Sequence, residues 1–318
     1  MLIVARWFKP QIERIRLQWP DVDFIAAPDE TETKTCSPAE WSGVEVAVVG
    51  GSTDLEPLLP YLPRLRWVHA ASVGVDRVAP VVRRQPQIVL TNARGSNATP
   101  IAEHVLMSIL AQARSLPEVL DDQRRQLWRQ HSAREVTGAT LVLAGYGTIG
   151  RETARRARGL GMNVIAVRRH AAGNVEEDGV RIVGPDAVES ILPAADYLAL
   201  MLPHTPETYH WLDERKLALL PPRCVVINVG RGSLVDEEAL LAALRAGRLS
   251  GACLDVFEKE PLPEGHPFWA TPGVMVTPHM AYASPRTVER GASIFSENLR
   301  RFLSGEPLLN RVDTERGY

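Results

Sequence analysis

Residues 141–161 read LVLAGYGTIGRETARRARGLG, and this stretch decides the fold. An apolar run leads into Gly145, Gly147 and Gly150, and a helical pattern follows them directly. Glycines at this spacing permit a tight turn after a strand and let a dinucleotide pyrophosphate approach the N-terminus of the next helix. We therefore predict a dinucleotide-binding turn made of Gly145, Tyr146, Gly147, Thr148, Ile149 and Gly150. A turn that is merely tight is the alternative.

The next apolar run, residues 164–167, ends in the adjacent cations Arg168 and Arg169. NAD-binding versions of this unit carry an acidic residue about 20 positions after the glycines, where it accepts the ribose hydroxyls. Arg168 holds that place, and a planar guanidinium suits the 2′-phosphate of NADP. The pair predicts NADP as the cofactor, with NAD as a further option. Only four of the 36 basic residues are lysines, so surface charges of an arginine-rich chain are the alternative.

Strand-like and helical runs alternate along the chain of 318 residues, which is long enough for two domains. Apolar residues at helical spacing from Pro100 predict a long buried helix between two α/β series. Ser284 and Gly305 bound one amphipathic helix after the second series. We predict an α/β fold of two doubly wound parallel-sheet domains, a dinucleotide-binding domain of residues 99–283 and a second domain of residues 1–98 and 284–318.

Composition and charge argue against several classes of function. The net charge is −2, and there is no basic excess of the kind that binds nucleic acid. No run approaches the roughly 20 apolar residues of a membrane span, and the N-terminus lacks a basic leader. We therefore expect a cytoplasmic protein without a nucleic-acid or membrane partner. Cys36, Cys224 and Cys253 lack metal-ligand spacing, so we expect reduced thiols and no metal site.

Three segments near the ends of predicted strands can supply chemistry. They are NVGRGSLVDEEAL with Arg231, LDVFEKEPLP with Glu260 and VTPHMA with His279. An arginine there can bind a carboxylate and a keto oxygen, a histidine can exchange a proton near neutral pH, and a neighbouring carboxylate would orient its ring. Together they suit hydride transfer. Singly, each has a structural alternative: a loop ion pair, a turn residue in a proline-rich loop, and a histidine satisfied within the fold.

Five motifs carry a resemblance to the D-isomer-specific 2-hydroxyacid dehydrogenases: AGYGTIG, LPHTPETYHWLD, NVGRGSLVDEEALLAAL, GACLDVFEKEPLP and TPHMA, in that order and spacing. The resemblance covers nearly the whole chain and is weakest in the first forty residues. It implies a flavodoxin-like substrate domain built from both chain ends and a Rossmann cofactor domain inserted between them. It also implies that Arg231 binds the substrate, that Glu260 supports the histidine and that His279 is the acid/base and contacts the substrate.

The same resemblance assigns further contacts. Asp255 matches the position that holds the nicotinamide carboxamide. The loop SVGVD, with Ser72, Val73 and Gly74, matches the loop whose backbone amides receive the substrate carboxylate. Further cofactor contacts are implied at Pro203, Thr208, Val229 and Gly230.

Two departures bear on cofactor and substrate. Arg168 stands where many relatives have aspartate, which is similar to the NADPH-using glyoxylate and hydroxypyruvate reductases of the family. The segment NATPIAEHVLMSIL locally resembles formate dehydrogenase. That branch carries glutamine where this chain has Glu260, and formate oxidation releases no hydroxyl proton, so the resemblance favours the hydroxy-acid reaction.

These observations predict an oxidoreductase that reduces small 2-keto acids, of the glyoxylate or hydroxypyruvate type, to D-2-hydroxy acids with NADPH. The resemblance further implies a homodimer formed through the cofactor domains. Two alternatives stay open. One is an NAD-dependent dehydrogenase of a larger D-2-hydroxy acid, and the other is a dinucleotide-sensing binding protein.

Overall fold

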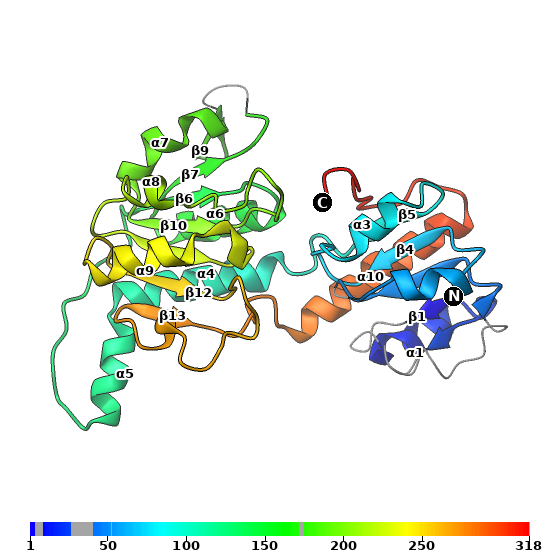
Figure 1. The fold of residues 1–318 in the computed structure, drawn as a ribbon, viewed down its shortest axis with the longest axis horizontal. Helices are drawn as coiled ribbons and strands as arrows, with labels where there is room; N and C mark the ends of the chain where they lie inside the picture. Colours follow the sequence, from blue (N-terminus) through cyan, green and yellow to red (C-terminus); the bar gives the residue numbers. More distant parts are fainter. Residues whose placement is uncertain (4–8, 27–40, 52, 172–174, 318) are drawn as a thin grey trace. The chain divides into compact units, whose positions relative to one another are not determined.

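The computed structural model describes residues 1–3, 9–26, 41–51, 53–171 and 175–317. The chain divides into two compact units (Figure 1). Unit 1 joins residues 1–97 with residues 284–318, and unit 2 consists of residues 98–283. Unit 2 is therefore a continuous segment inserted into unit 1.

Unit 1 contains a five-stranded parallel sheet with the order β2-β1-β3-β4-β5. This is the flavodoxin-like order of a doubly wound sheet, and it confirms the predicted fold class. Every residue of β3 and β4 is buried, as expected for apolar strands covered on both faces. The strands are β1 (Leu2–Ile3), β2 (Ile25–Ala26), β3 (Val46–Val49), β4 (Trp67–Ala70) and β5 (Val89–Asn92).

The C-terminal helix of unit 1, α10 (Pro285–Leu303), begins and ends where the sequence predicts. The Ser284 hydroxyl accepts the amide of Arg286 at 3.3 Å, and the chain leaves the helix through Gly305 in the left-handed region, with φ of +70°. Among the described residues, the other helices of unit 1 are α1 (Lys9–Gln18), the 3₁₀ helix η3 (Glu56–Tyr61) and α3 (Val78–Arg83).

Aromatic side chains join β4 to α10 in the core of unit 1. The ring centroids of Trp67 and His69 lie 5.5 Å and 5.3 Å from that of Phe295. The Thr91 hydroxyl accepts the indole N–H of Trp67 at 2.8 Å, and its oxygen also lies 2.8 Å from Nδ1 of His69. Complete burial lowers the pKa of His69 to about 3, so the ring is neutral at pH 7.

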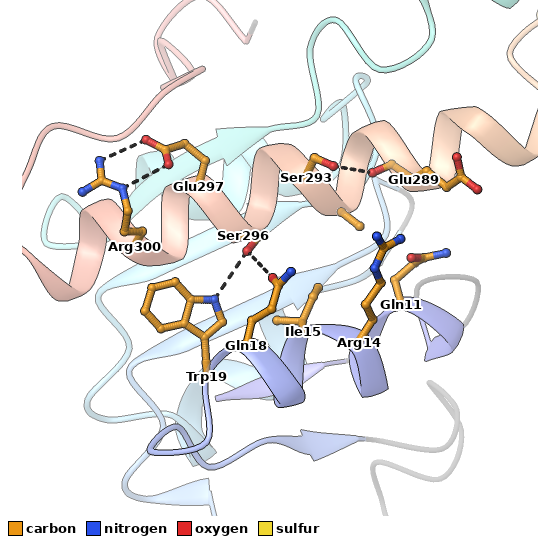
Figure 2. A pocket seen from close by; sticks show the side chains of 11 residues that line it. Gln11, Arg14, Ile15, Gln18, Trp19, Glu289, Ser293, Ser296, Glu297 and Arg300 are labelled. Atoms are coloured by element: carbon orange, nitrogen blue, oxygen red, sulfur yellow. Dashed lines mark hydrogen bonds and ion pairs between the residues drawn. The ribbon is translucent and has the colours of Figure 1, made fainter.

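A polar groove of about 340 Å³ lies between α1 and α10 (Figure 2). The indole N–H of Trp19 donates to the Ser296 hydroxyl at 3.4 Å, and that hydroxyl donates to Gln18 Oε1 at 3.0 Å. On α10, Glu297 accepts two hydrogen bonds from Arg300, at 3.0 Å and 3.1 Å. The groove is therefore a packing seam that ties the N-terminal helix to the C-terminal one.

Unit 2 contains an eight-stranded sheet with the order β13-β12-β11-β10-β6-β7-β9-β8. Apart from β8, neighbouring strands are parallel, in a Rossmann order extended by one strand, which confirms the predicted second domain type. β8 pairs antiparallel with β9 at the edge, a feature absent from our prediction. The strands are β6 (Thr140–Ala144), β7 (Asn163–Val167), β8 (Val175–Glu177), β9 (Val180–Val183), β10 (Tyr197–Leu200), β11 (Val225–Asn228), β12 (Gly251–Leu254) and β13 (Val274–Val276).

Helices cover both faces of this sheet. The long helix predicted from Pro100 is α4 (Ala98–Ala113), which begins two residues earlier and packs with α6 (Thr148–Gly159) on one face. Helices α7 (Val188–Ile191), α8 (Glu214–Leu217) and α9 (Glu237–Arg245) contribute to the core on the other face. Helix α5 (Leu116–Arg124) projects from the body of unit 2 (Figure 1). Short 3₁₀ helices are η4 (Pro185–Ala187), η5 (Leu192–Ala194), η6 (Gly232–Leu234) and η7 (Pro267–Trp269).

Two of the three cysteines are buried thiols of unit 2. Cys253 lies in β12, and Cys224 directly precedes β11 rather than lying within it. Burial raises the pKa of Cys253 to about 11 and that of Cys224 to about 12. Cys36 lies outside the described residues. Within the described ranges, no group of three or more histidine, cysteine or acidic side chains is arranged to hold a metal, and no helix has the length and apolarity to cross a membrane.

Candidate active site

The glycine turn joins β6 to α6 at the carboxyl end of β6. Gly145 has φ of +112°, and a Cβ on Gly150 would lie 2.3 Å from the Gly145 carbonyl oxygen, so both positions require glycine. A Cβ on Gly147 would meet no atom within 4 Å. Gly147 is also the N-cap of α6 and has no side chain to cap the first-turn amides. Open space above an uncapped helix N-terminus fits a dinucleotide pyrophosphate.

The other predicted turn residues offer backbone rather than side chains. Tyr146 is buried and its ring lies 4.8 Å below the guanidinium of Arg151. Ile149 packs against the core cluster that includes Tyr146 and α6. Thr148 is the first residue of α6.

Arg168, which directly follows β7, is paired with a carboxylate. Its Nη1 lies 3.0 Å from Oε2 of Glu177, the last residue of β8. The other oxygen of Glu177, Oε1, binds Nη1 of Arg151 near the start of α6. Arg169 is exposed at the same end of β7. Of the two arginines predicted to bind a phosphate, Arg168 is therefore held by Glu177 within unit 2.

The loops after β10 and β11 carry four further predicted cofactor residues. The Thr208 hydroxyl donates to the Pro203 carbonyl at 2.6 Å and accepts the Thr205 amide at 2.8 Å, so it braces its own loop. A Cβ on Gly230 would lie 3.0 Å from the Leu202 carbonyl oxygen, which shows how closely the two loops approach. Val229 is buried in the core.

Asp255, buried directly after β12, anchors the segment that follows β13. Its Oδ1 accepts the Thr277 hydroxyl at 2.6 Å and the Met280 amide at 2.9 Å, and its Oδ2 accepts the Ala281 amide at 2.9 Å. The His279 amide donates to the Asp255 carbonyl at 2.8 Å. These contacts hold His279 at φ of +49°, a left-handed conformation that side-chain-bearing residues rarely adopt. The carboxylate assigned to the nicotinamide carboxamide therefore also positions the histidine.

The imidazole of His279 is paired with Glu260. Nδ1 of His279 lies 2.6 Å from Oε2 of Glu260, and Oε1 of Glu260 accepts the Phe257 amide at 3.0 Å. The Tyr282 ring meets the imidazole edge-on, with centroids 6.0 Å apart. The two side chains are 44% and 34% exposed, so the pair is open to a ligand. With Nδ1 engaged, Nε2 is the nitrogen that can meet a substrate.

Arg231 lies on the loop after β11, at the same edge of the sheet as the loops that carry Glu260 and His279. Its Nη1 donates to the Gly230 carbonyl at 2.8 Å. A Cβ on Gly232 would lie 1.8 Å from the carbonyl carbon of Phe257, so the Arg231 loop packs directly on the loop that carries Glu260. Because β11, β12 and β13 are neighbours in the sheet, the loops of Arg231, Glu260 and His279 leave the same edge.

The loop of Ser72, Val73 and Gly74 belongs to unit 1 and follows β4. Its three carbonyl oxygens all accept hydrogen bonds, from the Ala93 amide at 3.0 Å, the Asn92 side chain at 2.8 Å and the Ser72 hydroxyl at 2.8 Å. A Cβ on Gly51 would lie 2.2 Å from the Gly74 carbonyl oxygen. The loop conformation is therefore fixed within unit 1.

Three residues outside our prediction support the site. Buried Asn228 donates to the Arg231 carbonyl at 2.8 Å and accepts the Gly230 amide at 3.1 Å, a turn role that an asparagine at a strand end can signal. Thr277 links Asp255 to His104 of α4, whose Nε2 lies 3.3 Å from its hydroxyl. Burial lowers the pKa of His104, and the negative charge of Asp255 offsets part of this effect. No local pattern pointed to His104.

A protein-family model matches residues 106–281. Its description is D-isomer specific 2-hydroxyacid dehydrogenase, NAD binding domain. The matched segment includes the glycine turn, Arg231, Asp255, Glu260 and His279.

Known proteins give the same family with different substrates. The D-3-phosphoglycerate dehydrogenase of Methanocaldococcus jannaschii is 31% identical over 85% of this chain, which spans only 52% of that relative. The glyoxylate reductase of Korarchaeum cryptofilum is 34% identical over 80% of this chain and 77% of its own length. A solved structure of the NADPH-dependent glyoxylate/hydroxypyruvate reductase of Sinorhizobium meliloti, in complex with NADP and sulfate, is 29% identical with a TM-score of 0.86, covering 100% of this chain and 99% of that one.

Proposed function

Because this chain belongs to the D-isomer specific 2-hydroxyacid dehydrogenase family, we propose that it reduces small 2-keto acids to D-2-hydroxy acids with NADPH. The observation that carries this proposal is the His279–Glu260 pair, 2.6 Å apart, with the Glu260 loop packed against that of Arg231. A carboxylate-supported histidine beside an arginine is what proton exchange with a bound keto acid requires.

Each unit has a proposed part in the reaction. Unit 2 binds the dinucleotide along the glycine turn, with Pro203, Thr208, Val229 and Gly230 on the adjoining loops and Asp255 near the nicotinamide. Unit 1 supplies Ser72, Val73 and Gly74 to the substrate carboxylate through backbone amides. The rigid carbonyl contacts of that loop support this assignment.

The side chains have distinct chemical roles. When bound, NADPH supplies a hydride to the keto carbon. Protonated His279 gives its Nε2 proton to the carbonyl oxygen, which becomes the product hydroxyl, while Glu260 stabilises the protonated ring and fixes its plane. Arg231 binds the substrate carboxylate and polarises the carbonyl.

Arg168 and Arg169 are the proposed contacts of the NADP 2′-phosphate. The NADPH-dependent relative from Sinorhizobium meliloti supports this cofactor, and NAD stays a second one. One charge-assisted contact corresponds to at least about tenfold in affinity. Replacing Arg168→Asp repels the phosphate and restores an acceptor for the ribose, so the preference for NADPH should fall or invert. A wild type that prefers NADH would overturn the cofactor assignment.

The substrate class is tested by a steady-state panel. Glyoxylate, hydroxypyruvate, 3-phosphohydroxypyruvate and larger 2-keto acids are each assayed with NADPH and NADH. Higher catalytic efficiency with glyoxylate or hydroxypyruvate supports the proposal. Preference for a larger acid with NADH favours the alternative dehydrogenase, to which the phosphoglycerate dehydrogenase relative lends support. Cofactor binding without turnover of any acid would favour a dinucleotide sensor.

A homodimer through α4 and α5 is the proposed assembly. Met107, Leu110, Leu116 and Leu120 are all between 40% and 45% exposed, and Trp128 after α5 is fully exposed. A group of this kind is typical of an interface. Light scattering should find a dimer that Leu120→Glu dissociates, while Leu17→Glu, on α1 of unit 1, leaves it intact. A monomeric wild type would contradict this assembly.

A further inference from the structure

Glu177 bridges two arginines at the proposed 2′-phosphate site. One carboxylate oxygen lies 3.0 Å from Nη1 of Arg168, and the other binds Nη1 of Arg151. The side chains of Arg168 and Glu177 are 32% and 33% exposed, so the cluster is open to solvent on one side. An anion held between two guanidinium groups is the arrangement that a phosphate would adopt there.

Sheet register explains why Glu177 reaches Arg168 although the two lie nine positions apart in the sequence. Glu177 pairs with Val180 across the β8–β9 hairpin, and Ile182 of β9 pairs with Ala166 of β7. Side chains alternate along a strand, so Val180, Ile182, Ala166 and Arg168 share one face, and Glu177 lies on it as well. The core cluster on this face includes residues of α6, the helix that carries Arg151.

The hairpin turn holds Glu177 at this place. Asp178 and Gly179 form the turn with φ of +51° and +69°, as a two-residue hairpin of this kind requires. The Asp178 carbonyl accepts a hydrogen bond from Arg158 at the other end of α6. The hydrogen bonds from Arg151 and then from Arg168 lower the pKa of Glu177, so it stays ionised at neutral pH.

We propose that Glu177 is a specificity-determining residue that competes with the cofactor 2′-phosphate for Arg168 and Arg151, and so weakens the preference for NADPH over NADH. This inference rests on the proposed cofactor function. A phosphate at this site must displace the carboxylate or share the two arginines with it. A ribose with a free 2′-hydroxyl does not need to displace the Glu177 carboxylate from these arginines. Glu177 therefore acts against one cofactor only.

The test compares the binding of two nucleotide fragments by calorimetry. Adenosine 2′,5′-bisphosphate carries the 2′-phosphate, and AMP lacks it. Glu177→Gln should tighten binding of the bisphosphate by about two- to fivefold, the upper part of the range for exposed ion pairs, and leave AMP binding unchanged. Glu177→Asp, which keeps the charge, should stay close to wild type.

Glu176→Gln is the matched control, because it removes the same charge from the neighbouring residue of β8, whose side chain points to the opposite face. Equal tightening by both glutamine variants would overturn the proposal as a general charge effect. Weaker bisphosphate binding by Glu177→Gln would also overturn it, since Glu177 would then present Arg168 to the phosphate. If Glu177→Gln binds the bisphosphate as wild type does while Arg168→Asp no longer binds it, only the role proposed for Glu177 is wrong. If no variant and no wild type binds either fragment, the cofactor proposal itself fails.

Discussion

Nδ1 of His279 lies 2.6 Å from one oxygen of Glu260, whose other oxygen accepts the Phe257 amide at 3.0 Å. The carboxylate is therefore fixed at both oxygens, and it fixes the imidazole in turn. Asp255 holds the backbone of the same histidine through two amides. The His279 amide donates to the Asp255 carbonyl, and the Met280 amide donates to Oδ1 of Asp255. Only Nε2 is left to exchange a proton with a substrate.

Replacing His279→Ala removes the proposed proton donor. General acid catalysis contributes about 10²- to 10⁴-fold, so turnover of keto acids should fall by that factor. Cofactor binding, followed by nicotinamide fluorescence, should persist because the glycine turn is untouched. Near-normal reductase turnover in this variant would contradict the assignment of His279.

Replacing Glu260→Gln removes the carboxylate that lies 2.6 Å from Nδ1 of His279 and stabilises the charge on the ring. A charge-assisted hydrogen bond contributes about 1.5 to 3 kcal/mol, so kcat for keto-acid reduction should fall at least about tenfold. Glu260→Asp, which keeps the charge, is the control. A kcat that matches wild type would leave Glu260 with a structural role only.

Arg231→Ala should weaken the use of substrate more than the binding of cofactor. A charge-assisted contact with a carboxylate contributes about 1.5 to 3 kcal/mol, so kcat/KM for keto acids should drop at least about tenfold. Arg231→Lys keeps the charge but not the planar guanidinium, so its kcat/KM should lie between those of wild type and the alanine variant. Unchanged kcat/KM in the alanine variant would mean that the carboxylate is bound elsewhere.

His69 makes the stability of unit 1 depend on pH. Its folded pKa is about 3, against an ordinary value of 6.5, so below pH 6.5 the unfolded chain binds a proton that the folded unit excludes. The free energy of unfolding should fall by about 1.4 kcal/mol for each pH unit from 6.5 toward 3. Above pH 6.5 the stabilising contribution of the neutral His69 is fully present.

Urea unfolding at pH 7 and pH 4.5 measures this contribution. His69→Leu should show a smaller loss between the two values, while His170→Gln, at an exposed position, should behave as wild type. The same loss in all three proteins would show that other groups cause it.

The sequence allowed the scaffold of the site to be predicted because its signals are local. The glycines of the β6–α6 turn, the apolar strands and the Ser284 cap each act within a few residues. The proposed catalytic residues after β11, β12 and β13 could be predicted from the order of the strands and from the family motifs.

The contacts of the site could not be predicted in the same way. The sequence predicts that Arg168 binds a phosphate. Whether Glu177 pairs with Arg168, however, depends on the register of a hairpin at the sheet edge. Asp255 binds the segment after β13 through backbone amides that no sequence pattern marks. Such contacts arise only when loops from different strands pack together.

The packing of α10 on β4 has a consequence for synthesis on the ribosome. The β4 residues Trp67 and His69 lie against Phe295, which is made only after all of unit 2. Unit 2 is continuous and can complete its core first, whereas the nascent unit 1 keeps an open aromatic face until the last helix emerges. We expect a nascent chain halted after residue 283 to be cleaved by protease within residues 1–97 well before unit 2. Equal resistance of both parts would show that β1–β5 close without their C-terminal helix.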